Sequence, residues 1–297
     1  QSSRTAPRRA KRKRFTVLVA SDGSPQARAA ARLAVDFPWP AHSVGAGLVA
    51  WGRELWGDRF AAEVVAGAGR VADETKRTLR RRWPAAAVAI ADASPVEAIL
   101  GRRPRPDVVV LGAHGYSPLE RLMLGSVSRA VVRRSTASVL VVKSPRRPPR
   151  HLVIGYDGSA NARRAVKMVA GLAMPRNARV TLLGLCEVVR PPAIGLMPAT
   201  IRASLAAEAR AFNAKRVAAT RRRLERAAKP LAAAGWRVSV DARPGIAVRE
   251  LVAAGEALRA DVVVIGARGA SGLRRIFLGS VAEAVLDRSA VPVLLVR

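Results

Sequence analysis

Two glycine-spaced segments contain the residues of this chain that are best suited to chemistry. The first is GAHGYSPLERLMLGS, from Gly112 to Ser126, and the second is GARGASGLRRIFLGS, from Gly266 to Ser280. Both follow the pattern Gly-x2-Gly-x9-Gly-Ser. Glycines let backbone N–H groups approach an oxyanion closely, and a helix that begins after the loop adds unpaired N–H groups and the positive end of its dipole. The pattern therefore predicts two phosphate-binding loops.

Polar side chains at matching positions strengthen this interpretation. Ser126 and Ser280 close the two loops, and we expect each to cap the following helix and to donate to a phosphate oxygen. Arg121 and Arg275 each lie four residues before the last glycine of their loop. A guanidinium at that position can donate two hydrogen bonds to a polyphosphate.

A second pair of similar segments indicates that the chain is a duplication. Residues 15–34, FTVLVASDGSPQARAAARLA, are similar to residues 151–170, HLVIGYDGSANARRAVKMVA. In this alignment Asp22 corresponds to Asp157. Features that recur in the same order indicate homologous domains. We predict a disordered basic tail over 1–14, a first domain over 15–143, a linker over 144–150 and a second domain over 151–297.

Apolar runs alternate with helical patterns in both halves. Runs such as DVVVLG and DVVVIG are continuously apolar, which is typical of parallel strands covered on both faces. Ser24 and Ser159 are expected to cap the helices that follow the first strands. The pattern predicts an α/β fold of two tandem, doubly wound, five-stranded parallel-sheet domains, for which we take the strand order to be 3-2-1-4-5. Strands are expected near 15–20, 43–50, 86–91, 107–111, 138–142, 151–155, 178–185, 236–241, 261–265 and 292–296.

In that strand order the first and fourth strands are neighbours, and ligands bind beyond the carboxyl ends of the strands where the order reverses. Each Asp-Gly-Ser turn should then share a pocket with the glycine loop of its own domain. Asp22 and Asp157 would accept from a ribose hydroxyl or a base, at the opposite end from the phosphates. Two alternatives stay open: the glycines serve only close packing of helix and strand, or the loops keep their shape without a ligand.

The glycine spacing, the Asp-Gly-Ser turn and the closing PVLLV strand together resemble the universal stress protein family, over residues 15–297. The resemblance implies a Rossmann-like, adenine nucleotide alpha hydrolase-like fold. It also implies that ATP is the ligand, with or without a bound Mg²⁺ ion. It also implies that Leu48 and Leu185 line adenine pockets and that Val127 and Val281 join the phosphate loops. The predicted nucleotide sites comprise Ala20, Ser21, Asp22, Leu48, Gly112, Gly115, Arg121, Gly125, Ser126 and Val127 in the first domain, and Gly155, Tyr156, Asp157, Leu185, Gly266, Gly269, Arg275, Gly279, Ser280 and Val281 in the second.

The predicted function is an ATP-binding regulator or sensor in a stress response, with one nucleotide per domain and no enzymatic role. The chain has no Gly-x4-Gly-Lys-Ser/Thr, Gly-x-Ser-x-Gly or His-Glu-x2-His motif, and Glu120, the only acid in either loop, has no counterpart in the second copy. Weak ATP hydrolysis remains the enzymatic alternative. An intrachain pseudo-dimer is expected because two related domains in one chain can pack together, and a homodimer is expected because exposed final strands could pair further chains. The first copy, STASVLVV, lacks the proline that precedes the final strand of the second, which leaves the pairing geometry open.

Composition adds a rival function and a location. The net charge is +31, of which the tail contributes seven, so nonspecific binding to polyanions is expected. A nucleic-acid-associated protein with degenerate nucleotide sites is therefore an alternative, although the arginine clusters 80–82 and 221–223 fit solvated helix faces. No apolar run approaches the roughly 18 residues of a membrane span, and the single Cys186 suits the cytoplasm. The three histidines are scattered, so no metal site is predicted.

Overall fold

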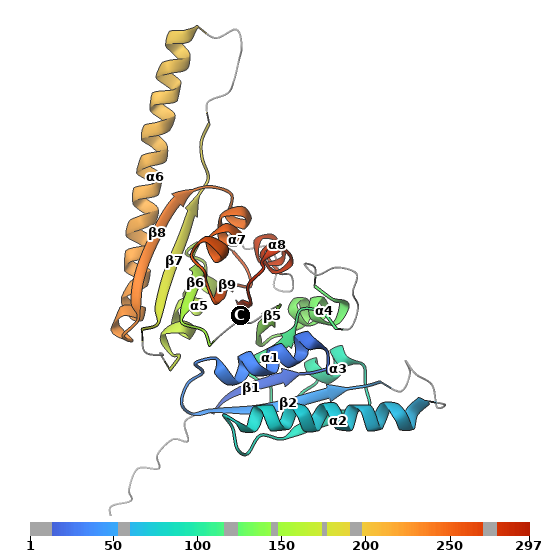
Figure 1. Cartoon of the computed structure of the whole chain (residues 1–297). Coiled ribbons are helices and arrows are strands. Elements are labelled where there is room, and N and C mark those ends of the chain that lie inside the picture. The colour runs from blue at the N-terminus through green and yellow to red at the C-terminus, as the bar shows by residue number, and fades with distance from the viewer. Residues whose placement is uncertain are drawn as a thin grey trace, which may run out of the picture.

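The computed structural model describes residues 14–52, 60–115, 124–143, 148–173, 177–190, 198–269 and 278–297. Strands and helices alternate over these ranges (Figure 1). The predicted basic tail and linker lie mostly outside the described residues and stay predictions. No helix within the described ranges combines the length and the apolar character that crossing a bilayer requires.

The described part of the first half contains five strands, and each overlaps a strand expected from the sequence. The strands are β1 (Phe15–Ala20), β2 (Ser43–Ala50), β3 (Val88–Ala91), β4 (Val108–Gly112) and β5 (Ser138–Val142). The helices between them are α1 (Pro25–Asp36), α2 (Ala61–Arg80), α3 (Pro95–Leu100) and α4 (Ser126–Arg134).

The second half repeats this order of elements. Its strands are β6 (His151–Gly155), β7 (Arg179–Cys186), β8 (Arg237–Pro244), β9 (Val262–Gly266) and β10 (Val293–Val296). Its helices are α5 (Ala160–Ala170), α6 (Ala199–Ala233), α7 (Ala247–Ala257) and α8 (Ser280–Arg288). The extra residues of the second copy lengthen its second helix, since α6 has 35 residues and α2 has 20. Figure 1 shows α6 extending beyond the sheet.

All ten strands of the described residues form one sheet in the order β3-β2-β1-β4-β5-β10-β9-β6-β7-β8. Within each half the strands are parallel and follow the predicted order 3-2-1-4-5, so the predicted fold class is confirmed. The two halves join where β5 and β10 pair antiparallel. The expectation that exposed final strands could pair further chains is wrong, because each final strand already has two neighbours.

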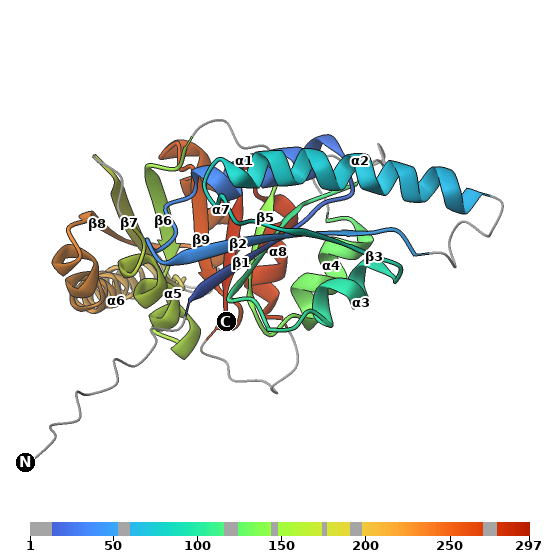
Figure 2. The ribbon, with the colours of Figure 1, turned by 90° about the horizontal axis from the view of Figure 1, so that it is seen from below.

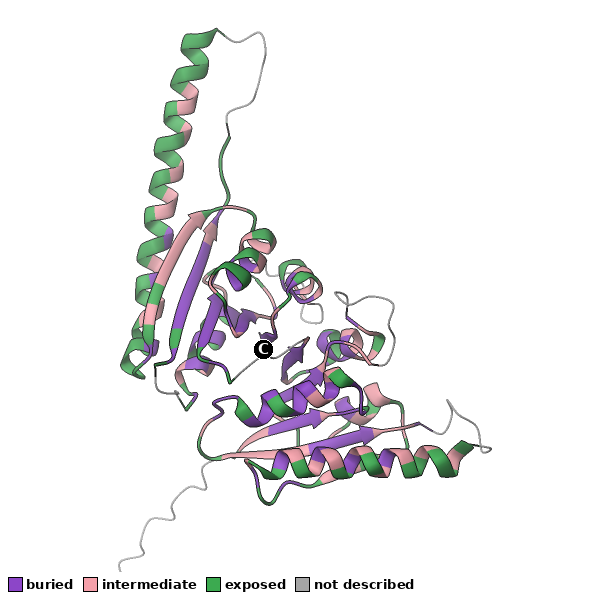
Figure 3. Ribbon diagram, viewed as in Figure 1, coloured by how far each residue is buried: buried purple, intermediate pink, exposed green. Residues whose placement is uncertain are grey.

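Helices cover both faces of the sheet (Figures 1 and 2), which explains why the central strands are continuously apolar. Val108 and Val110 of β4 belong to the core under α1 and α2, whereas Val109 and Leu111 belong to the core under α3 and α4. The first core runs across the domain boundary and includes buried residues of α5 and α6, and the second includes those of α7 and α8. Figure 3 shows these strands buried in both halves.

The predicted serine caps of the first helices are confirmed. The Ser24 hydroxyl accepts from the N–H of Ala27 at 3.1 Å, and the Ser159 hydroxyl accepts from the N–H of Ala162 at 3.0 Å. Both serines have extended backbones at the N-cap position. These bonds fix the point at which each Asp-Gly-Ser turn becomes a helix.

The arginine clusters are only partly solvated, so this part of the sequence interpretation is wrong for two side chains. Arg82 donates to the carbonyl oxygens of Val35 and Trp39 at 3.2 and 3.1 Å, at the carboxyl end of α1. Its burial lowers the pKa of the guanidinium, and Asp36 opposes that shift. The Nε atom of Arg223, in the second cluster, is also buried. Orphan carbonyls at a helix end attract such donors, which the sequence pattern does not reveal.

Charged contacts join the two halves beside β5 and β10. Arg129 of α4 lies 3.2 Å from the carboxylate of Asp287 on α8, and Lys143 donates to the carbonyl oxygen of Asp287 at 2.8 Å. Burial lowers the pKa of Lys143 to about 8, although the negative charge of Asp287 acts in the other direction. The amine is therefore held in a partly dehydrated position at the domain boundary.

We predict that Gly45→Ala destabilises the protein whereas Gly69→Ala stabilises it. A Cβ atom at position 45 would lie 2.1 Å from Cε3 of buried Trp83, and such overpacking costs about 1–3 kcal/mol. A Cβ atom on the helical Gly69 meets nothing within 4 Å, and alanine is favoured over glycine in a helix by about 1 kcal/mol. Urea unfolding of both variants measures the difference. Equal unfolding free energies would contradict this packing of Trp83.

A second prediction concerns pH. Because the pKa of Lys143 is lower in the folded state, the unfolded chain binds more protons between about pH 8 and the ordinary lysine value of 10.5. The contribution of Lys143 to the unfolding free energy should therefore become more favourable as the pH rises through this window. The measurement is the unfolding free energy of the wild type minus that of Lys143→Met, from pH 7 to 10. Lys167→Met, at an exposed position of α5, is the control, and identical pH trends for both variants would contradict the prediction.

Candidate functional site

The turn after β1 and the loop after β4 meet, as the strand order requires. β1 pairs directly with β4. A Cβ atom built on Gly115 would lie 2.7 Å from Oδ2 of Asp22, so the loop backbone lies against that carboxylate. The Ser24 hydroxyl also donates to the carbonyl oxygen of His114 at 3.5 Å. The two motifs are about 90 residues apart in the chain and form one site.

The second domain repeats this contact. β6 pairs with β9, and a Cβ atom on Gly269 would lie 3.0 Å from Oδ2 of Asp157. The Ser159 hydroxyl donates to the carbonyl oxygen of Arg268 at 3.2 Å. Both predicted meetings of an Asp-Gly-Ser turn with a glycine loop are therefore present.

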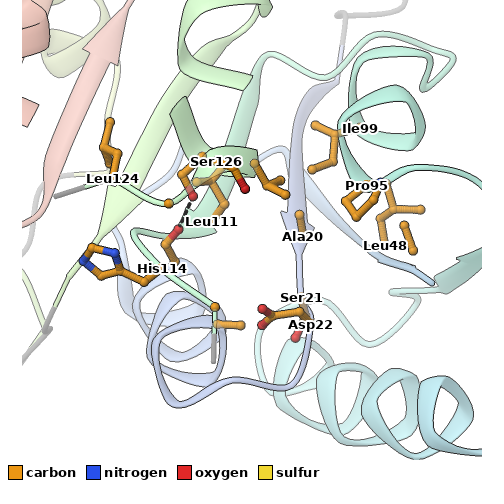
Figure 4. Close-up of a pocket in the computed structure, with 17 residues that line it drawn as sticks. Ala20, Ser21, Asp22, Leu48, Pro95, Ile99, Leu111, His114, Leu124 and Ser126 are labelled. Atoms are coloured by element: carbon orange, nitrogen blue, oxygen red, sulfur yellow. Dashed lines mark hydrogen bonds between the residues drawn. The ribbon is translucent and has the colours of Figure 1, made fainter. Parts of the chain in front are cut away.

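The first meeting point opens into a cavity of about 420 Å³ (Figure 4). Leu48, Pro95 and Ile99 lie on one side of it, and His114 lies on the other. The carboxylate of Asp22 points between them. Every predicted residue of this site that falls in the described ranges lines the cavity: Ala20, Ser21, Asp22, Leu48, Gly112, Gly115, Gly125, Ser126 and Val127.

The second meeting point encloses a smaller cavity of about 180 Å³. It is also lined by every predicted residue of its domain within the described ranges: Gly155, Tyr156, Asp157, Leu185, Gly266, Gly269, Gly279, Ser280 and Val281. Tyr156 stands where the first domain has Ser21, so a larger side chain occupies this rim. Arg121 and Arg275, the predicted polyphosphate ligands, lie outside the described residues.

The structure requires glycine at the different loop positions for different reasons. A Cβ atom on Gly112 would lie 2.9 Å from the backbone of Gln26, and one on Gly266 would lie 2.9 Å from the backbone N of Ala162. These two glycines are required for close packing of the first helix, which was the alternative to ligand binding. Gly115 and Gly269 instead lie against Asp22 and Asp157. A side chain at either position would take up space beside the carboxylate of the cavity.

The expected capping role of Ser126 and Ser280 is wrong. The N-cap residues of α4 and α8 are Gly125 and Gly279, each with an extended backbone and no side-chain cap bond. The serines are the first helical residues and line the cavities. Because the first N–H groups of a helix have no intrahelical partner, both cavities end at donors suited to an anion.

Sequence reasoning missed several lining residues. Ser128 lines the first cavity, and its hydroxyl donates to the carbonyl oxygen of Gly112 at 2.7 Å, which ties α4 to the end of β4. Pro95 and Ile99 belong to α3, and Leu251 of α7 takes the matching place in the second cavity. The third helix begins at the same edge of the sheet, so topology could have indicated these residues, but no motif marks them.

Acidic side chains are scarce at the sites. Asp22 and Asp157 are the only carboxylates among the described residues that line the two cavities. Within the described ranges no group of three His, Cys, Asp or Glu residues is placed to hold a metal ion. The arrangement offers one acceptor, one apolar wall and one helix N-terminus in each domain.

Comparison with known proteins agrees with this architecture. The family model described as the Universal stress protein family matches residues 13–143 and again 149–297. The universal stress protein Rv2005c of Mycobacterium tuberculosis is 29% identical over 255 residues, which cover 83% of this chain and 79% of that protein. The universal stress protein MJ0531 of Methanocaldococcus jannaschii is 30% identical over 148 residues, covering 50% of this chain and 82% of that protein.

A solved structure supports the same fold over nearly the whole chain. The crystal structure of a universal stress protein from Archaeoglobus fulgidus superposes with a TM-score of 0.65 at 21% sequence identity, covering 95% of this chain and 96% of that chain. The family model matches each half separately, and the halves share one strand order. This chain belongs to the universal stress protein family and contains two of its domains in tandem.

Proposed function

We propose that the chain binds ATP at the meeting point of the Asp-Gly-Ser turn and the glycine loop in each domain, and that it acts as a nucleotide-dependent regulator in a stress response. The observation that carries the proposal is the contact between Gly115 and Asp22, repeated between Gly269 and Asp157. At this contact an acceptor and the unpaired N–H groups of a helix start border a single cavity. The family supports the link to stress, and a cytoplasmic location is part of the proposal.

The lining of the first cavity supports a bound nucleoside. Leu48, Pro95 and Ile99 offer an apolar wall for a base, and the Asp22 carboxylate can accept from ribose hydroxyls. The N–H groups at the start of α4 and the Ser126 hydroxyl can donate to phosphate oxygens. Mg²⁺, where present, would bind chiefly through the phosphates, because Asp22 is the only carboxylate that the described residues contribute.

The two sites differ in size, which supports unequal affinities. The first cavity of about 420 Å³ falls within the range of about 300–1,000 Å³ that is usual for ligand pockets. The second, of about 180 Å³, falls below that range. We propose that ATP fills the first domain at lower concentrations than the second. The homodimer remains a separate prediction, which light scattering at working concentration tests.

We predict that Gly115→Ala weakens the tighter phase of ATP binding at least tenfold. The new methyl group would lie 2.7 Å from Oδ2 of Asp22 and displace its carboxylate from the ribose position. Loss of a hydrogen bond to a charged group costs about 1.5–3 kcal/mol, and about 1.4 kcal/mol corresponds to a factor of ten. Isothermal titration calorimetry measures the change.

Gly69→Ala is the matched control, because it adds the same methyl group at an open position of α2. Gly269→Ala should affect only the weaker phase. A folded wild type that shows no saturable ATP binding overturns the proposed function, and an unchanged tight phase in Gly115→Ala overturns the assigned site.

Weak ATP hydrolysis is the enzymatic alternative, and we predict that it is absent at these sites. The cavity-lining residues in the described ranges include one carboxylate per site and no paired acid to activate water. ATP incubated with the protein for hours should be recovered intact by chromatography. ADP production that falls with Gly115→Ala, but not with Gly69→Ala, would contradict this prediction, whereas production unaffected by both variants indicates contamination.

A further inference from the structure

A third cavity, of about 1020 Å³, lies between the two domains and shares only Arg268 with the described lining of the second predicted nucleotide site. The first domain contributes the end of α4 and the residues after it, and the second contributes the start of α5, the residues after β9, part of α8 and Arg297. We call it the inter-domain arginine cavity. Its described lining residues are Arg133, Arg134, Ser135, Thr136, Asn161, Arg164, Ala267, Arg268, Leu278, Glu283 and Arg297.

The cavity has a large excess of positive side chains. Five arginines and one glutamate line it, which gives a side-chain charge of 5 − 1 = +4. Glu283 is already engaged, because its carboxylate lies 2.5 Å from Arg133 and 3.7 Å from Arg129. The only side-chain carboxylate among the described lining residues is therefore already paired with arginines of α4.

Three of these arginines have no acidic partner within the described ranges. Arg134 is exposed at the end of α4, and Arg164 donates only to Oδ1 of Asn161, at 2.6 Å. The Nη2 atom of Arg297 donates to the carbonyl oxygen of Val132, while its Nε atom is buried without a hydrogen-bond partner. Buried donors without partners are costly, so Arg297 is poised for an acceptor.

Arg268 adds to the positive field around Arg297. Burial lowers the pKa of Arg297, and the positive charge of Arg268 lowers it further. Burial and a neighbouring positive charge therefore both disfavour the charged form of Arg297. A bound anion beside Arg297 would offset both effects.

We propose that the inter-domain arginine cavity binds an oligophosphate anion that bridges the two domains. A guanidinium group can donate two hydrogen bonds to one phosphate group. Several arginines around one cavity therefore suit a ligand with several phosphates. Leu278 and Ala267 are the only residues in the described lining with wholly apolar side chains. The volume is at the upper end of the range for small-molecule pockets, which is large enough for a chain of phosphates.

The test uses inorganic tripolyphosphate, which has no base or ribose, and the full chain with Gly115→Val and Gly269→Val to fill both proposed nucleotide sites. Calorimetry at about 150 mM salt limits nonspecific adhesion. We expect one tripolyphosphate per chain. Binding should weaken at least tenfold when Arg134→Gln, Arg164→Gln and Arg297→Gln are added together.

The matched control is the same background with Arg202→Gln, Arg210→Gln and Arg222→Gln, which removes three exposed positive charges from α6. This control should bind tripolyphosphate with nearly unchanged affinity. If the cavity triple variant does not fold, Arg134→Gln alone is used, because its side chain is exposed, and at least threefold weakening is expected. Equal weakening in cavity and control variants would show general polyanion adhesion and overturn the proposal.

Two further outcomes also decide the matter. If tripolyphosphate does not bind while a single-stranded oligonucleotide binds in a way that requires the cavity arginines, the ligand is nucleic acid and the proposal is wrong. ATP binding to the wild type is measured separately, so failure of the proposed function leaves the tripolyphosphate result interpretable. The second outcome supports two independent kinds of site. In it, the three cavity substitutions abolish tripolyphosphate binding, and the same substitutions in a chain that keeps Gly115 and Gly269 leave ATP binding intact.

Discussion

The pairing of β1 with β4, and of β6 with β9, is the constraint on which the rest of the structure depends. Parallel neighbours cannot be joined by tight turns, so the chain must cross over through helices, and these helices cover both faces of the sheet. The same pairing brings the end of the first strand beside the end of the fourth. Asp22 and Gly115 meet for this reason, and the duplicated chain makes the equivalent meeting of Asp157 with Gly269.

The antiparallel pairing of β5 with β10 determines how the two domains are related. It joins two five-stranded sheets into one and leaves β3 and β8 at the edges of the described sheet. It also places α4 beside α8, where Arg129 and Arg133 meet Glu283 and Asp287. The inter-domain arginine cavity is a consequence of this joint, since neither domain supplies all of its walls.

The two copies share a fold but have diverged around their sites. Ser128 ties α4 to the end of β4, whereas alanine at the matching position 282 cannot make that bond. Tyr156 takes the place of Ser21, and the cavity beside it is the smaller of the two. The long α6 brings Arg223 against Gly158. Equal glycine spacing therefore does not make the two sites equal, because side chains outside the motif define the space that remains.

The sequence by itself determined the duplication, the alternation of strands and helices, the strand order and most of the cavity-lining residues. It could do so because burial on both faces requires continuous apolar strands, and because glycines and short polar turns recur at fixed spacing. Only the tertiary structure decided the pairing of β5 with β10, the N-cap role of Gly125 in place of Ser126, the burial of Arg82 and the wall formed by Pro95 and Ile99. These features depend on which surfaces meet across long sequence separations, and local patterns of residue type do not encode such meetings.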